Sequence, residues 1–171
     1  MNEYLEITIL FVTAYILGAI PFAYVFTKLF SKRNIMEIGW KKASSSNVLM
    51  NVGKLPALLT FIFDVLKGFA IVYVAKEVGL SCTTQAIAGF LTLVGHNYSI
   101  FLDFRGGRGI ATLLGACLAF NPIIGLTVLI PVILTAFVWT ASIGTIIAYL
   151  MAITWGYLIQ DYGLFLLFLL C

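Results

Sequence analysis

The chain has 171 residues, of which 62% are hydrophobic and only 10% are charged, and its formal net charge at pH 7 is +3. A water-soluble domain of this size does not need so much apolar surface, whereas a protein that crosses the membrane several times does. The basic residues lie in short loops between hydrophobic segments, which argues against nucleic-acid binding. The composition therefore predicts an all-α, polytopic integral membrane bundle.

The first apolar segment, residues 5–30, contains Gly18 and Pro21. Proline removes a helix hydrogen bond and glycine lets helices approach closely, so we expect a kink or a close helix contact here. The polar loop that follows, residues 28–54, carries most of the chain's lysines and arginines. By the positive-inside rule this loop faces the cytoplasm, and the N-terminus lies outside.

The remaining apolar segments are shorter. Residues 110–120 cover only about half of a bilayer at about 1.5 Å per residue, and Asn121-Pro122 then breaks the helix. We predict a single domain over residues 1–171, with six full or partial transmembrane helices and an incomplete seventh. The expected segments are residues 5–30, 55–75, 84–102, 110–120, 122–139 and 143–159, with the incomplete one at 163–171.

Two ionisable residues, Asp64 and Lys67, lie well inside the second apolar segment. They are three residues apart and share a helix face. Ionisable groups at this depth face the interior of a bundle and pair with one another. We interpret them first as a structural ion pair; the functional alternative is that Lys67 reaches a substrate phosphate.

The polar loop contains a second informative stretch, in which Lys41 and Lys42 precede three serines at 44–46 and then Asn47. Hydroxyl, amide and ammonium groups together could cradle a phosphorylated substrate. The alternative is an ordinary loop, with Trp40 at the membrane interface and the lysines attracting anionic lipid head groups. For the lysines alone we favour this alternative.

The most informative stretch is residues 95–112, whose centre reads Arg105-Gly106-Gly107-Arg108-Gly109. Glycines let an oxyanion approach backbone amides, and arginines supply paired donors for a phosphate. A helix is expected to begin after Gly109, and a helix start favours an anion. The loop could instead only set topology, but topology needs no glycines, so we favour a phosphate site.

The single histidine of the chain, His96, lies just before this loop. It is a candidate general base, or equally a helix-end histidine whose ring is satisfied by the backbone. The carboxylates are few and scattered, and the three cysteines have no metal-like spacing. We therefore expect neither a metal nor a cofactor.

These stretches together resemble the acyl-phosphate-dependent glycerol-3-phosphate acyltransferase family, the PlsY type. The resemblance is strongest at residues 95–96 and 101–112, where the family typically has a lysine at the position of Arg108. The matching stretches occur in one order and cover most of residues 15–145. They are residues 17–24, 47–49, 53–54, 64–68, 95–96 and 101–112.

The resemblance implies a multi-pass protein of the bacterial inner membrane with a cytoplasm-facing active site. Such a protein transfers an acyl group from acyl phosphate to the 1-hydroxyl of glycerol 3-phosphate, giving lysophosphatidate and phosphate, without direct use of coenzyme A or acyl carrier protein. Residues 105–109 would hold glycerol 3-phosphate. The candidate catalytic residues are His96, Asn47 and Ser46, and the further substrate-binding candidates are Lys41, Lys42 and Lys67.

The chain also departs from the family pattern. Trp40, Lys41 and Lys42 stand where the family has Ser, Gly and Asn, and Met50 stands where it has Arg. The family's C-terminal motif is not found before Cys171, which implies a truncated chain or an altered activity. Two alternatives stay open, a catalytically degenerate relative and a small carrier for a phosphorylated solute. A carrier should have a central site and internal repeats, whereas an enzyme should gather its charges at one cytoplasmic face.

Overall fold

The computed structural model describes residues 3–123 and, beyond them, residues 125, 126, 129, 130, 147, 150, 154, 166, 169 and 170. Every regular element in this part of the chain is a helix, as the composition predicted. The predicted segments beyond residue 123 lie outside the described residues, apart from these few positions. The elements are α1 (Glu3–Ala19), α2 (Phe22–Ser31), α3 (Ser45–Asn51), α4 (Lys54–Glu77), α5 (Cys82–Asn97), the 3₁₀ turn η1 (Ile100–Leu102) and α6 (Ile110–Phe120).

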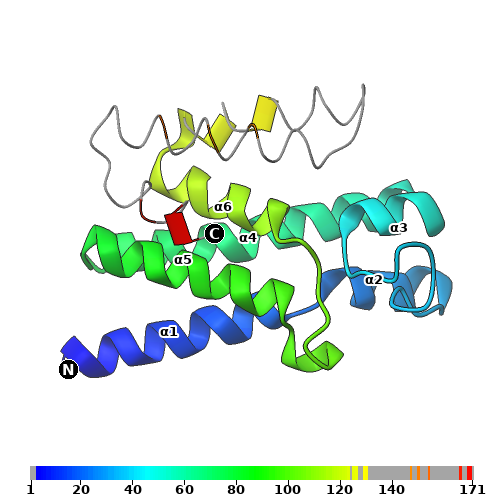
Figure 1. Cartoon of the computed structure of the whole chain (residues 1–171), viewed down its shortest axis with the longest axis horizontal. Coiled ribbons are helices and arrows are strands. Elements are labelled where there is room, and N and C mark those ends of the chain that lie inside the picture. Colours follow the sequence, from blue (N-terminus) through cyan, green and yellow to red (C-terminus); the bar gives the residue numbers. More distant parts are fainter. Residues whose placement is uncertain are drawn as a thin grey trace.

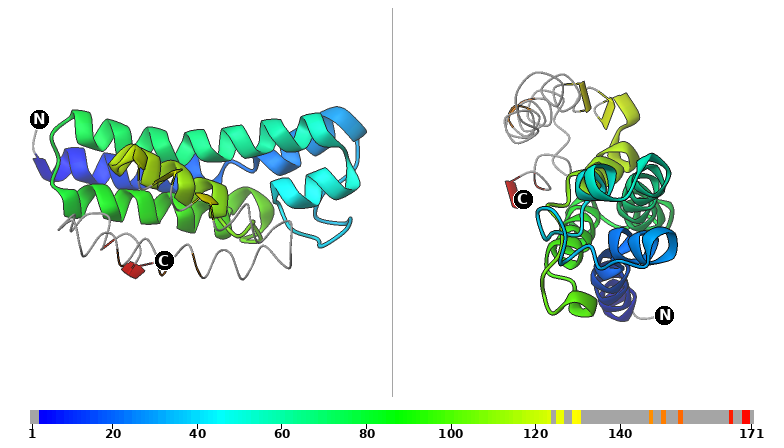
Figure 2. Two further views of the ribbon diagram at one scale, coloured as in Figure 1. Left: turned by 90° about the horizontal axis from the view of Figure 1, so that it is seen from above. Right: turned by 90° about the vertical axis from the view of Figure 1, so that its right-hand side faces the viewer.

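Among the described residues, two stretches are long and apolar enough to cross a membrane, Tyr4–Ser31 and Lys54–Glu77. The second of these is α4, whose 24 residues measure about 36 Å at 1.5 Å per residue, more than the hydrocarbon core of a bilayer. The helices run roughly parallel to one another along the long axis of the molecule (Figures 1 and 2). One end of this bundle carries α2, α3, the end of α5 and the start of α6.

The first apolar segment is interrupted where the sequence predicted it. Helix α1 ends at Ala19 and α2 begins at Phe22, because Pro21 has no amide proton to continue the hydrogen-bond ladder. Two backbone carbonyls at the break accept hydrogen bonds from side chains that are distant in the sequence. The Ser99 hydroxyl donates to Ala19 O at 2.6 Å, and the Lys67 ammonium donates to Ile20 O at 3.2 Å. The break therefore provides polar attachment points inside an apolar bundle.

Glycines bring the helices together in two pairs. In the pair α1 and α5, a Cβ on Gly18 would collide with the backbone of Thr92, and a Cβ on Gly95 would collide with Tyr15 O. The pair α4 and α6 repeats this arrangement with Gly68 and Gly115, whose Cβ positions are filled by backbone atoms of the partner helix. Contact of backbone on backbone through glycine is a common way of packing membrane helices, and it confirms the close contact expected at Gly18.

The polar loop after α2 holds one more helix than predicted. Helix α3 spans Ser45–Asn51, and Ser44 caps it by accepting a hydrogen bond from the Asn47 amide at 3.3 Å. The Asn47 side chain is fully buried and donates to Ile35 O, Ile38 O and Lys42 O at 3.0–3.3 Å. Its Oδ1 atom accepts hydrogen bonds from the backbone amide of Trp40 at 3.1 Å and from the side-chain Nδ2 of Asn51 at 2.9 Å. Asn47 thus holds the loop in one shape.

Helix α6 has the predicted bounds, from Ile110 to Phe120, and Asn121 ends it in an extended conformation. Lys76, near the end of α4, donates to the terminal carbonyls of α6, Ala119 O at 3.4 Å and Phe120 O at 3.3 Å. A lysine at the negative end of a helix dipole is stabilising. Helices α4 and α6 therefore contact each other through the Lys76 hydrogen bonds at this end and through close backbone packing at Gly68 and Gly115 along their length.

Candidate active site

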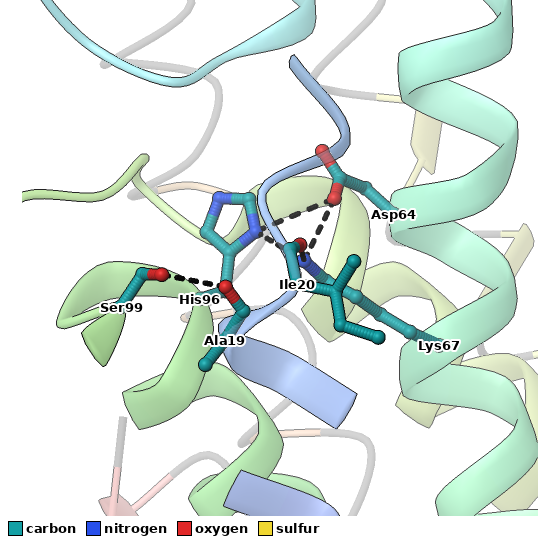
Figure 3. A network of polar contacts seen from close by, with 6 residues as sticks. All are labelled: Ala19, Ile20, Asp64, Lys67, His96 and Ser99. Atoms are coloured by element: carbon teal, nitrogen blue, oxygen red, sulfur yellow. Dashed lines mark hydrogen bonds and ion pairs between the residues drawn. The ribbon is translucent and has the colours of Figure 1, made fainter. Parts of the chain in front are cut away.

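A buried polar network joins α4, α5 and the break after α1 (Figure 3). The Lys67 Nζ atom lies 2.8 Å from Asp64 Oδ1, 2.9 Å from His96 Nδ1 and 3.2 Å from Ile20 O. Each of the three side chains is at most 7% exposed. The ion pair expected from the spacing of Asp64 and Lys67 is confirmed, and His96 is its unforeseen third member.

The glycine-rich loop folds back onto the end of α5. Asp103 and Phe104 both have positive φ values, +52° and +59°, which reverse the chain. The amide of Gly106 then donates to Asn97 O at 2.9 Å, and the amide of Gly107 donates to His96 O at 3.2 Å. These two amides are used within the fold, so a bound anion would have to find its donors elsewhere.

In the structure, close packing explains why both of these positions are glycines. A Cβ on Gly106 would collide with the carbonyl oxygens of His96 and Asn97. A Cβ on Gly107 would collide with His96 Nε2 and with Ala43 O, which comes from the first polar loop. Gly107 is therefore the point at which three stretches meet: the end of α5, the glycine-rich loop and the first loop. We call this point the Gly107 junction.

The helix start predicted after the loop lies at Gly109, which caps α6 with a φ of +71°. The first backbone bond of α6 is from Leu113 N to Gly109 O, so the amides of the preceding turn point out of the helix end. The arginines on either side of the glycine pair are exposed, and Arg105 Nη2 lies 3.5 Å from Asp103 Oδ2. This end of the loop offers positive charge at a helix N-terminus.

The predicted residues are thus only partly brought together. Lys67 and His96 are in direct contact, and the Gly107 junction adjoins them through His96 Nε2. Lys42 directly precedes the buried Ala43 of the junction, while its own side chain is exposed, like those of Lys41 and Ser46. The Asn47 side chain bonds within its own loop and α3, to Trp40, Ile35, Ile38, Lys42 and Asn51.

Two backbone groups, Ile20 O and Ala43 O, belong to this region and were not predicted. A proline in a membrane helix is a usable signal for such groups, because it leaves carbonyls without helical partners. Ala43 gives no such signal. Among the described residues, no group of three or more His, Cys, Asp or Glu side chains is arranged to hold a metal ion.

The glycine-rich loop and the network lie on a chain whose residues 8–171 match the family model "Glycerol-3-phosphate acyltransferase". The chain belongs to the glycerol-3-phosphate acyltransferase family. Among its relatives, the glycerol-3-phosphate acyltransferase of Dechloromonas aromatica is 40% identical over 124 residues, which are 72% of this chain and 63% of the relative. That of Thermoanaerobacter sp. is 37% identical over 151 residues, 85% of this chain and 76% of the relative. The chain thus spans less than two thirds of the Dechloromonas relative.

Two solved structures of the family are also similar. The glycerol 3-phosphate form of PlsY (YgiH), an integral membrane glycerol 3-phosphate acyltransferase, superposes with a TM-score of 0.85 at 28% identity, over 96% of this chain and 86% of that one. The lysophosphatidic acid form superposes with a TM-score of 0.83 at 26% identity. The resemblance inferred from the sequence is therefore confirmed. The prediction that the chain is a multi-pass membrane protein of the PlsY type is confirmed as well.

Proposed function

We propose that this chain, as a single domain, transfers an acyl group from acyl phosphate to the 1-hydroxyl of glycerol 3-phosphate, giving lysophosphatidate and inorganic phosphate. Membership of the family supports this activity, as do solved relatives described in glycerol 3-phosphate and lysophosphatidic acid forms. The observation that carries the assignment to a site is the Gly107 junction, where His96 and two loops meet beside the start of α6.

The reaction needs little covalent catalysis by the protein, because an acyl phosphate is a mixed anhydride with a good leaving group. The hydroxyl oxygen attacks the acyl carbon, the bond from that carbon to the phosphate oxygen breaks, and phosphate leaves with the electron pair. The hydroxyl proton passes to a base, for which His96 and a substrate phosphate oxygen are the candidates. Orientation of the hydroxyl and neutralisation of phosphate charge then supply most of the rate.

In this proposal the cations have different tasks. Arg105 and Arg108, with the first turn of α6, bind the phosphate of glycerol 3-phosphate, because their charge lies at a helix N-terminus. Lys41, Lys42 and the exposed Ser46 line the approach from the first loop. Asn47 serves the reaction by holding that loop, since its side chain bonds to loop and α3 atoms.

The rival reading, a carrier for a phosphorylated solute, is not favoured. The basic loop before α4 and the glycine-rich loop with its arginines lie at the same end of the bundle (Figures 1 and 2). That gathering of charge suits an enzyme with a site at one membrane face. A degenerate relative is distinguished from an active enzyme only by assay.

The phosphate-binding role of Arg108 is tested by two substitutions. Arg108→Ala should raise the KM for glycerol 3-phosphate at least tenfold, since hydrogen bonds to charged groups contribute about 1.5–3 kcal/mol. Arg108→Lys should stay within about threefold of the parent, because the charge is retained. The assay is phosphate release from palmitoyl phosphate with and without glycerol 3-phosphate, on purified protein in detergent.

The matched control is Arg33→Ala, an exposed arginine of the first loop outside the proposed phosphate site. Equal KM values for Arg108→Ala and the parent would remove Arg108 from the site. A parent protein without glycerol-3-phosphate-dependent turnover would instead favour a degenerate relative.

We further propose that the N-terminus lies outside the cell and that the active site faces the cytoplasm. The excess of lysine and arginine in the first loop supports this orientation. In a cysteine-free background, Val78→Cys should react with a membrane-impermeant maleimide added to intact cells, whereas Lys42→Cys should react only after the cells are opened. Both positions are exposed; Val78 caps the C-terminal end of α4, whereas Lys42 lies in the loop that precedes α3 and the N-terminal end of α4. Labelling of Lys42→Cys in intact cells would reverse the orientation.

A further inference from the structure

The bonding of the Lys67 ammonium decides what His96 can do. An ammonium group has three N–H donors and no acceptor. Three partners surround Lys67 Nζ: Asp64 Oδ1 at 2.8 Å, His96 Nδ1 at 2.9 Å and Ile20 O at 3.2 Å. The contact with Asp64 is an ion pair, and the bond to Ile20 O uses one ammonium proton. Because an ammonium has no acceptor, the 2.9 Å contact with Nδ1 is a hydrogen bond that Lys67 donates.

An imidazole nitrogen that accepts a hydrogen bond carries no proton. The neutral ring has one proton, so it must lie on Nε2. The opposite arrangement would put the proton on Nδ1 and leave Lys67 as a neutral amine. It is disfavoured because a lysine amine is ordinarily a stronger base than imidazole by about four pKa units, and both groups share the same carboxylate. The direct distance from His96 Nδ1 to Asp64 Oδ1, 3.5 Å, is also longer than either bond through Lys67.

The second ring nitrogen points away from Asp64 and Lys67 (Figure 3). It faces the Gly107 junction, because Nε2 and Ala43 O both lie where a Cβ of Gly107 would be. We infer that Lys67 is a positioning residue that holds His96 as a neutral Nε2–H donor, so that His96 gives a hydrogen bond at the Gly107 junction and is not the general base. The kinetic part of this inference rests on the proposed function and takes a substrate phosphate oxygen as the acceptor.

One measurement tests the protonation state without any assay. Because His96 is the single histidine of the chain, protein labelled with ¹⁵N-histidine and purified on a histidine-free tag has one imidazole signal pair. At pH 7 we expect one nitrogen in the non-protonated range, assigned to Nδ1, and one in the protonated range, assigned to Nε2. Two protonated nitrogens, or a proton on Nδ1, would overturn the inference.

The role of Lys67 is tested in the same spectrum. In the variant Lys67→Met with Asp64→Leu, Nδ1 loses its donor, and the signals should move toward the averaged positions of exchanging tautomers. An unchanged spectrum in that folded variant would show that Lys67 does not set the tautomer. A variant that fails to fold leaves the wild-type spectrum to decide between donor and base.

Two substitutions at His96 separate donor from base in turnover. His96→Gln places an amide near the position of Nε2 and cannot act as a base, and we expect its kcat to stay within about tenfold of the parent. His96→Asn keeps an acceptor for Lys67 but is too short to reach the junction, so its KM for glycerol 3-phosphate should rise at least tenfold. A loss of 100- to 10,000-fold in kcat for His96→Gln, the usual contribution of a general base, would contradict the inference. A parent without turnover would count against the proposed function alone, since the spectrum is independent of it.

Discussion

Replacement of Lys67 by methionine is expected to abolish the folded protein, and a second replacement, Asp64→Leu, is expected to restore it in part. The single variant leaves the Asp64 carboxylate buried without its cation, and breaking a buried pair in this way costs about 3–5 kcal/mol. The double variant removes both charges and replaces them with apolar side chains of similar size. Fluorescence-detected size-exclusion chromatography in detergent, with thermal challenge, measures the effect.

Lys54→Met is the matched control for this experiment. Lys54 begins the same helix but is exposed, so its removal should leave the elution profile and the melting temperature nearly unchanged. If Lys67→Met and the double variant are equally damaged, the pairing of the two charges is not what the fold needs from Lys67. Its bond to Ile20 O, at the break after α1, would then be the more important contact.

The second large effect is expected at Gly107. Gly107→Ala should reduce the kcat/KM for glycerol 3-phosphate by about 100-fold or more, because the added methyl group collides with His96 Nε2 and Ala43 O. The acyl phosphate should still be bound, so its KM should change much less. Initial rates of phosphate release, with each substrate varied at saturation of the other, separate the two effects.

Gly79→Ala provides the comparison, since a Cβ there meets no atom within 4 Å and the residue lies just after the C-terminal end of α4. Its cost is limited to about 1–2 kcal/mol for a left-handed backbone, and its turnover should be close to that of the parent. Equal kinetics of Gly107→Ala and the parent would mean that the junction is not part of the substrate site.

The parts of the fold that follow from local chemistry were predicted from the sequence. The apolar composition gave the membrane class, Pro21 gave the break, and Gly109 and Asn121 gave the bounds of α6. Helix α3 was missed because its seven residues show no apolar period long enough to detect, and it depends on the Ser44 cap and the bonds of Asn47.

The site was harder to predict, because its contacts join stretches that are distant in sequence. Lys67 and His96 are 29 residues apart on different helices, and the sequence around neither residue predicts their contact. The glycine pair at 106–107 predicts backbone amides that are free to bind an anion. Its amides are instead bonded to the end of α5, and its missing side chains make room for His96 and Ala43.

The interruption after α1 has a consequence for how a charge survives at this depth. At a protein surface, a lysine ammonium is hydrated by water molecules, which a bilayer interior does not supply. An unbroken helix offers its carbonyls less readily, because they already accept hydrogen bonds from its own amides. Because Pro21 ends the helix at Ala19, Ile20 O lies outside the helical ladder, and it accepts the Lys67 ammonium as a water molecule would, beside the Phe22 amide. The ammonium thus has a solvation shell that is built into the chain and stays fixed in direction.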